Sequence, residues 1–204
     1  MKLQCIFACA LAVATFQIQA QATPIRPVLK FSKIVMDADS SKAAQKVRVG
    51  TICLFAGAPI SFGTERTLTK ERFERLFINV ANEHGWTVES TATDMFDGEG
   101  STTTATFLIG AKLRVIRVDV CDSLDGQKGT IEVVVEWQVF DREKKQVVAT
   151  VNTPGRGMVG KFNQDGYNTL FNDAFVSAAK ALASTSEAAA IFGPAVPATA
   201  AKSP

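Results

Sequence analysis

The sequence has few of the residues with which enzymes usually move protons. Among its 204 residues there is one histidine and one tyrosine. No G-x-S-x-G motif surrounds a serine, so a nucleophile of the hydrolase type is not recognisable. An excess of charge is also missing, since 22 Lys and Arg face 20 Asp and Glu, scattered along the chain. A balance this close to neutral argues against a nucleic-acid partner and against strong attraction to anionic lipid.

Long hydrophobic runs are absent except at the start of the chain. Residues 4–18 are mostly apolar and follow Lys2, and Ala20-Gln21-Ala22 has the small-x-small pattern of a signal-peptidase site. The run is shorter than the roughly 20 apolar residues that a membrane-spanning helix needs. We therefore expect residues 1–22 to be a signal peptide. The mature protein, with no transmembrane segment, would then begin at Thr23 in the periplasm or outside the cell.

A lipoprotein signal is the alternative interpretation of the leader. Ile6-Phe7-Ala8-Cys9 has the outline of a lipobox, in which Cys9 would be acylated and would become the mature N-terminus. Bulky Phe7 and a very short apolar region before Cys9 make this the less favoured alternative.

Cysteine is scarce, and two of the four cysteines lie in the leader. The remaining pair, Cys53 and Cys121, predicts one disulfide in an oxidising compartment. The alternative is two buried thiols that do not meet.

Composition divides the mature chain into three parts. Residues 23–45 begin with prolines and end in a polar run, which predicts an extended N-terminal arm, with at most one strand, and a linker. Residues 193–204 lack large side chains and predict a disordered Pro/Ala tail. A single α/β domain is expected over 46–192.

Within that domain, hydrophobic periodicity predicts the order β-α-β-β-β-β-α. Helix signals run from the cap at Thr69 to Gly85 and again over 170–182, and strand patterns cover 47–55, 86–89, 103–121, 131–139 and 147–151. The alternation changes phase near Val115 and Ile116, which predicts a β-bulge. We expect an α+β fold: a twisted, mostly antiparallel sheet with two helices packed on one face.

Residues 155–161 match the phosphate-binding pattern G-x-x-x-x-G-K, but Phe162 stands where Ser or Thr should hold magnesium. A glycine-rich connection between the last strand and the second helix explains them better. Residues 94–100 and 122–126 contain Asp-Gly pairs but lack the ligand spacing of a calcium loop, so turns are expected. No metal or cofactor is predicted.

His84 falls in the last turn of the first helix, where a cation suits the helix dipole. Pairing of His84 with Cys53 or Cys121 would make a nucleophile, but a disulfide would disable it. We therefore expect no enzymatic activity. Three phenylalanines in predicted loops, Phe62, Phe96 and Phe162, are candidate partner contacts, and the alternative is that they fold back onto the core.

Two resemblances bear on function. Residues 131–151 and 165–184, with Trp137-x-Val139-x-Asp141, an acidic hairpin and an Ala-rich closing helix, resemble the periplasmic auxiliary lipoproteins of ABC-type lipid transport systems. The same residues resemble, more loosely, the N-terminal domain of the Tol-system propeller protein and the periplasmic domain of the curli secretion channel. Residues 49–88, together with the two cysteines and Val135-Glu136-Trp137, resemble an uncharacterised segment found ahead of exported trypsin-like proteases.

The first resemblance implies a non-enzymatic accessory component of a cell-envelope assembly or lipid-transport complex. The second implies a regulatory or recognition module for an exported serine protease. In either case the expected partner is a protein of the cell envelope, and self-association is a further option. No catalytic residues are carried over by either resemblance.

Overall fold

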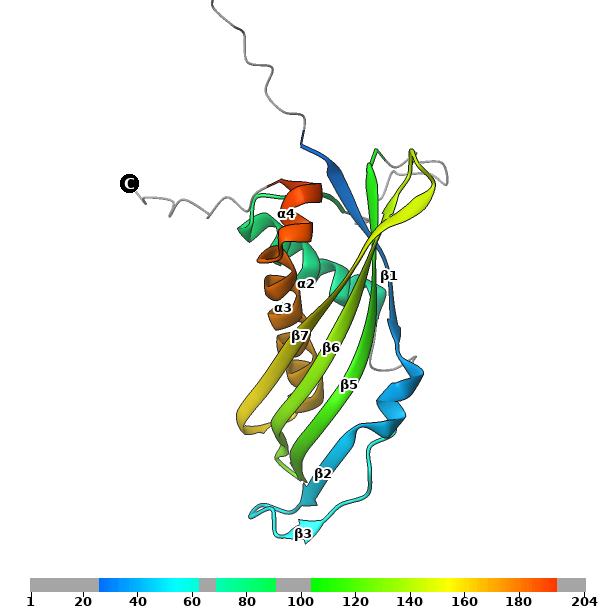
Figure 1. The fold of residues 1–204 in the computed structure, drawn as a ribbon. Helices are drawn as coiled ribbons and strands as arrows, with labels where there is room; N and C mark the ends of the chain where they lie inside the picture. The colour runs from blue at the N-terminus through cyan, green and yellow to red at the C-terminus, as the bar shows by residue number, and fades with distance from the viewer. Residues whose placement is uncertain (1–25, 63–68, 91–103, 194–204) are drawn as a thin grey trace, which may run out of the picture.

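Three long strands form most of a seven-stranded sheet. The structure, a computed structural model, describes residues 26–62, 69–90 and 104–193. Strands β5 (Phe107–Ser123), β6 (Gly126–Asp141) and β7 (Gln146–Asn163) follow one another as antiparallel neighbours. Tight turns join them, so these strands make a continuous meander (Figure 1).

The other side of β5 pairs with two shorter strands, one after the other. β1 (Val28–Met36) runs parallel to the first part of β5, and β2 (Ala44–Val49) runs parallel to its last part. β4 (Thr87–Glu89) extends the sheet beyond β1, and β3 (Phe55–Ala56) extends it beyond β2. The sheet is therefore mixed, because β1 and β2 both add parallel pairs.

A short 3-10 helix, η1 (Ala38–Lys42), connects β1 to β2 beside a bulge in β5. The pairing of β5 with β6 shifts register between Val115 and Arg117, as the phase change in the sequence predicts. At the bulge the Val115 N–H donates a 3.0 Å hydrogen bond to Ser40 Oγ, and Ser40 is buried. This bond satisfies a backbone donor at the irregular position.

Three helices cover one face of the sheet (Figure 1): α2 (Lys70–Glu83), α3 (Gly166–Ala183) and α4 (Ser186–Phe192). The core between the two layers is rich in aromatic rings, and Trp137 is fully buried at its centre. Trp137 Nε1 donates to Thr153 Oγ1 at 2.7 Å, and that hydroxyl donates to the Ala178 carbonyl at 2.8 Å. These two consecutive hydrogen bonds give the indole N–H an acceptor and link β6, β7 and α3. No helix among the described residues has the length and apolarity to cross a membrane.

The α+β class and the placement of helices on one face are confirmed, and four predictions need correction. The strand expected over 47–55 is interrupted, because β2 ends at Val49, residues 50–54 form a loop, and β3 is only Phe55–Ala56. The arm expected over 23–45 is, from Val28 on, an interior part of the sheet, because Leu29 and Phe31 of β1 are fully buried in the core. The connection expected at 155–162 is the second half of β7. A further helix, α4, follows α3. Residues 1–22, the predicted signal peptide, and most of the predicted tail fall outside the described residues.

Candidate functional site

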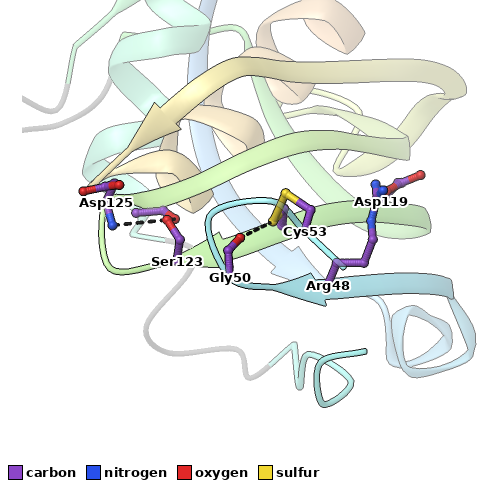
Figure 2. The surroundings of a disulfide bond; sticks show 8 residues. Arg48, Gly50, Cys53, Asp119, Ser123 and Asp125 are labelled. Atoms are coloured by element: carbon purple, nitrogen blue, oxygen red, sulfur yellow. Dashed lines mark hydrogen bonds and ion pairs between the residues drawn. A yellow bond between two sulfur atoms is a disulfide. The ribbon is translucent and has the colours of Figure 1, made fainter. Parts of the chain in front are cut away.

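A disulfide joins the chain segment after β2 to the central strand β5. Cys53 and Cys121 are bonded, with their Cα atoms 5.6 Å apart, as the sequence predicts. The bonded Cys121 Sγ lies 3.2 Å from the Gly50 carbonyl oxygen, and the Gly50 N–H donates to the Asp122 carbonyl at 2.8 Å. Figure 2 shows the disulfide beside the ion pair of Arg48 with Asp119. Residues 50–54 are therefore fastened to β5 at several points.

This fastened loop exposes apolar side chains. Ile52, Leu54 and Phe55 are 70%, 72% and 68% exposed, and Leu124, in the neighbouring β5–β6 turn, is 97% exposed. The loop and the turn lie at the same end of the sheet, because Val49 of β2 pairs with Asp122 at the end of β5. We call these four residues the apolar tip. Contiguous exposed apolar side chains are a feature of interaction surfaces, so the tip is a candidate contact region.

The face of β5, β6 and β7 opposite the helices forms a second surface, which we call the outer face. Side chains alternate along these strands, so buried residues such as Leu113 and Val133 face the helices and Lys112, Arg114 and Glu132 face outward. A hollow of about 430 Å³ on this face is lined by Asp37, Lys112, Arg114, Val134, Glu136 and Asn152. Another, of about 420 Å³, lies beside the disulfide and reaches Arg48, Lys128 and Met158.

Two carboxylates near these strands are held in their charged form. The backbone N–H of Asp39, 3.0 Å from Asp37 Oδ1, lowers the pKa of Asp37 below its ordinary value of 3.8, and Lys112, 3.2 Å away, adds to this. The backbone N–H of Lys144 and the Lys144 ammonium likewise lower the pKa of Asp141. Both groups therefore serve local structure, as the cap of η1 and as the anchor of the β6–β7 turn.

The phosphate-binding pattern at residues 155–161, which the sequence itself disfavours, has no place in this fold. Gly155 and Gly160 lie within β7, so the pattern does not form a loop between a strand and a helix. Two of the glycines are required by packing. A Cβ on Gly155 would lie 2.1 Å from the Ala174 carbonyl oxygen, and one on Gly157 would lie 1.9 Å from that of Leu170. They allow α3 to pack close against β7.

His84 is the residue at the C-terminal end of α2, and its ring lies 6.3 Å from that of Trp86. Both cysteines are consumed by the disulfide, so a Cys–His nucleophile cannot form while that bond is closed. Within the described part of the chain, no three His, Cys, Asp or Glu side chains come together in a way that would hold a metal ion. The acidic segment 122–126 forms the β5–β6 turn, as expected, and 94–100 lies outside the described residues.

The three candidate phenylalanines have different surroundings. Phe62 is half-buried and packs edge-on against Phe171, with ring centroids 6.2 Å apart, so it folds back onto the core. Phe162 is not in a loop but near the end of β7, where the Lys128 ammonium lies 4.3 Å from its ring centroid. Phe96 lies outside the described residues. Contact of these side chains with a partner stays a prediction.

Sequence reasoning missed the apolar tip and the basic side chains of the outer face. Leu124 gave a signal, since it is an apolar residue inside a polar Asp-Gly turn. Lys112 and Arg114 gave another, because they occupy the outward positions of an alternating strand. The run that contains Ile52, Leu54 and Phe55 has the same apolar pattern as a buried strand, and for this reason the sequence predicts a strand there.

Comparison with known proteins adds little to this description. No protein-family model matches the sequence, and no curated protein matches it. Among solved structures, a DUF330-family protein of Xanthomonas campestris is similar at 12% identity and a TM-score of 0.35, over 78% of this chain and 86% of that one. A hypothetical protein of Chlamydia trachomatis gives the same identity and TM-score, over 80% and 96%. A proposed lipoprotein of Caulobacter crescentus has 11% identity and a TM-score of 0.32, over 67% and 80%. Likenesses at this level assign neither a family nor a function.

Proposed function

We propose that this chain is an exported, non-enzymatic binding domain of the cell envelope that docks on a protein partner through its apolar tip. The observation that carries the proposal is the exposure of Ile52, Leu54, Phe55 and Leu124, which is 68% or more for each side chain. Burying one such side chain contributes about 1.5–3 kcal/mol, so the tip offers substantial binding free energy.

The disulfide supports this proposal because it gives the tip a defined shape. Cys53 has a positive φ of 57°, a conformation that an ordinary L-residue seldom adopts without support from its surroundings. The bond to Cys121 and the Gly50 contacts supply that support. A loop that is ordered before binding loses less conformational entropy in the complex than a free loop.

The disulfide also supports an exported location, since such a bond persists in an oxidising compartment. The predicted signal peptide provides the route. An accessory role in envelope assembly or lipid transport follows from the resemblance of residues 131–184 to auxiliary lipoproteins. A partner from an envelope assembly or lipid-transport complex would support this role. An exported protease as the partner would support the alternative, a recognition module for that protease.

Replacing the tip tests the proposal directly. We expect the variant Ile52→Ser/Leu54→Ser/Phe55→Ser to fold and to lose its envelope partner, with at least about a hundredfold lower affinity, because three apolar side chains no longer become buried. The measurement is co-purification from the native envelope, followed by titration of the partner so identified. Val147→Ser is the matched control, since Val147 is 51% exposed at the start of β7, next to the β6–β7 turn.

Two results would contradict the proposal. One is undiminished co-purification by the triple variant. The other is an equal loss in Val147→Ser, which would indicate a general effect of removing exposed apolar side chains. Sedimentation of the purified protein identifies a second copy of the chain as the occupant if the wild type is oligomeric and the triple variant is monomeric.

A further inference from the structure

Basic side chains form a row on the outer face. Lys112, Arg114 and Arg117 point outward from the central strand β5, the last of them after the bulge. Neighbouring strands add further basic residues at outward positions: Lys33 on β1, Lys46 and Arg48 on β2, Lys128 on β6 and Arg156 on β7. Lys30 of β1 also faces outward and pairs with Glu89 of β4 at 3.0 Å. The other acidic residues on or beside this face are fewer than the basic ones: Asp37, Asp119, Glu132 and Glu136. Charge that is scattered in the sequence is thus gathered on one surface by the fold.

Part of this positive charge is already neutralised and part is not. Lys112 forms an ion pair with Asp37 at 3.2 Å, and Arg48 and Lys46 both form ion pairs with Asp119. Arg114, Arg117 and Arg156 form no direct ion pair with any residue that the structure describes, and their charge is compensated only in part. The charge of Arg114 acts on Asp37, and Glu132 stands opposite both Arg117 and Arg156. The Nε atom of Arg114 is buried and has no hydrogen-bond partner among those residues. The Nε atoms of Arg48 and Arg72 are buried as well, so a ligand would meet the guanidinium of Arg114 through its terminal Nη groups, which carry four further N–H donors.

The surroundings of Arg114 define what such a ligand would contain. In the ladder across β5, β6 and β7, Arg114 stands opposite Val134, and Val134 stands opposite Pro154. Ile116, 41% exposed, projects next to them. The ligand therefore meets a bidentate donor for an anionic oxygen on one side and apolar side chains on the other.

We infer that the outer face binds an extended acidic segment of a protein, with a carboxylate on Arg114 and apolar side chains against Ile116, Val134 and Pro154. The adjoining hollow of about 430 Å³ has room for side chains of such a segment. Charge complementarity between the basic row and spaced carboxylates selects the partner and speeds its association.

The position of the acidic residues favours a polypeptide over a dense polyanion. Glu132 stands directly opposite Arg117 on one side and Arg156 on the other, and Glu136 stands opposite Lys112. A polyphosphate chain or an anionic bilayer would place negative charge next to these glutamates and be repelled. A polypeptide whose carboxylates alternate with apolar side chains avoids them, and its backbone N–H groups find acceptors in Glu136 and Asn152.

This inference does not rest on the proposed function, because none of its residues belongs to the apolar tip. A variant that loses partner binding at the tip but still binds at the outer face would leave the inference about the outer face intact. A variant that loses binding at the outer face alone would likewise leave the proposed function of the tip intact. The probe is a short fluorescein-labelled peptide of alternating glutamate and leucine, and binding is followed by fluorescence anisotropy at low and at high salt.

We expect the wild type to bind this peptide, more weakly at high salt, and to ignore the corresponding lysine–leucine peptide. Arg114→Gln and Arg156→Gln should each weaken binding, by about tenfold or more for Arg114→Gln, because a charge-assisted hydrogen bond is lost. Arg75→Gln is the matched control, since Arg75 is exposed on α2, on the helical side of the molecule. Circular dichroism checks that each variant is folded. If Arg114→Gln does not fold, the binding measurement on Arg156→Gln tests the inference.

Several results would overturn the inference. They are no binding of the peptide by the wild type, an equal loss in Arg75→Gln, and tighter binding of inorganic polyphosphate or of phosphatidylglycerol vesicles than of the peptide. The last result would assign the face to a polyanion instead of a protein.

Discussion

At the scale of single residues, two glycines determine how closely the helical layer approaches the sheet. Gly155 and Gly157 face α3 from β7, and helix backbone carbonyls occupy the space where their Cβ atoms would lie. Gly160, in the same strand, has no heavy atom within 4 Å of its Cβ position. The same residue type is therefore required by packing at two positions of one strand and is free to change at a third.

We predict that Gly157→Ala destabilises the fold by about 2 kcal/mol or more, because a methyl group 1.9 Å from the Leu170 carbonyl oxygen forces α3 away from β7. Gly160→Ala should change the free energy of unfolding by less than about 0.5 kcal/mol. Urea denaturation of both variants checks this pair. Equal stabilities of the two variants would mean that α3 does not pack on β7 as described.

At the scale of elements, the sequence predicts those strands and helices whose local pattern agrees with their burial. The bulge in β5 follows from the change of phase at Val115, and α2 follows from its apolar stripe and from Gly85, whose φ is 73°. β1 and the second half of β7 could not be predicted in this way. Prolines and a polar run flank β1, and Pro154 with three glycines makes β7 look like a loop, yet tertiary contacts with β5 and α3 hold both as strands.

The β6–β7 turn contributes a pH-dependent element. Asp141 accepts hydrogen bonds from the backbone N–H groups of Glu143 and Lys144 at 2.9 and 3.0 Å, which lowers the pKa of Asp141 in the folded state. Because the pKa in the folded state lies below the ordinary value of 3.8, this carboxylate stabilises the fold above pH 3.8. The contribution is lost as pH falls from 3.8 through the pKa of the folded state.

We therefore predict that Asp141→Asn reduces the loss of stability below pH 3.8, since the amide oxygen still accepts from the turn but does not titrate. The measurement is the denaturation midpoint of wild type and variant as a function of pH. A variant whose midpoint falls as steeply as that of the wild type in this range would show that Asp141 is not held in its charged form.

At the scale of the whole molecule, the helical layer buries one face of the sheet and leaves the apolar tip and the outer face exposed. The sequence predicts that one face of the sheet is buried, because the alternation of apolar and polar residues in strands and the apolar stripes of helices indicate which faces are buried. It does not predict the apolar tip or the basic row, because both are formed by residues that lie far apart in the chain, such as Phe55 with Leu124 and Lys33 with Arg156.

The link between Cys53 and Cys121 spans 68 residues and restricts the unfolded chain. Closing a loop of this length contributes about 4 kcal/mol in the chain-entropy account. The link also positions the tip and borders the outer face at Arg48. Export and closure of this disulfide are therefore the conditions on which the proposed role of the apolar tip depends.

The intact mass of the protein recovered from its native envelope, with and without reduction, tests this central claim most directly. We predict a chain that begins at Thr23 and gains about two mass units on reduction, one for each sulfur of the Cys53–Cys121 bond. A mass that is unchanged by reduction would contradict the disulfide-supported tip. A chain that retains residues 1–22 would contradict cleavage after Ala22, and an acylated Cys9 would mean that the domain is anchored to lipid.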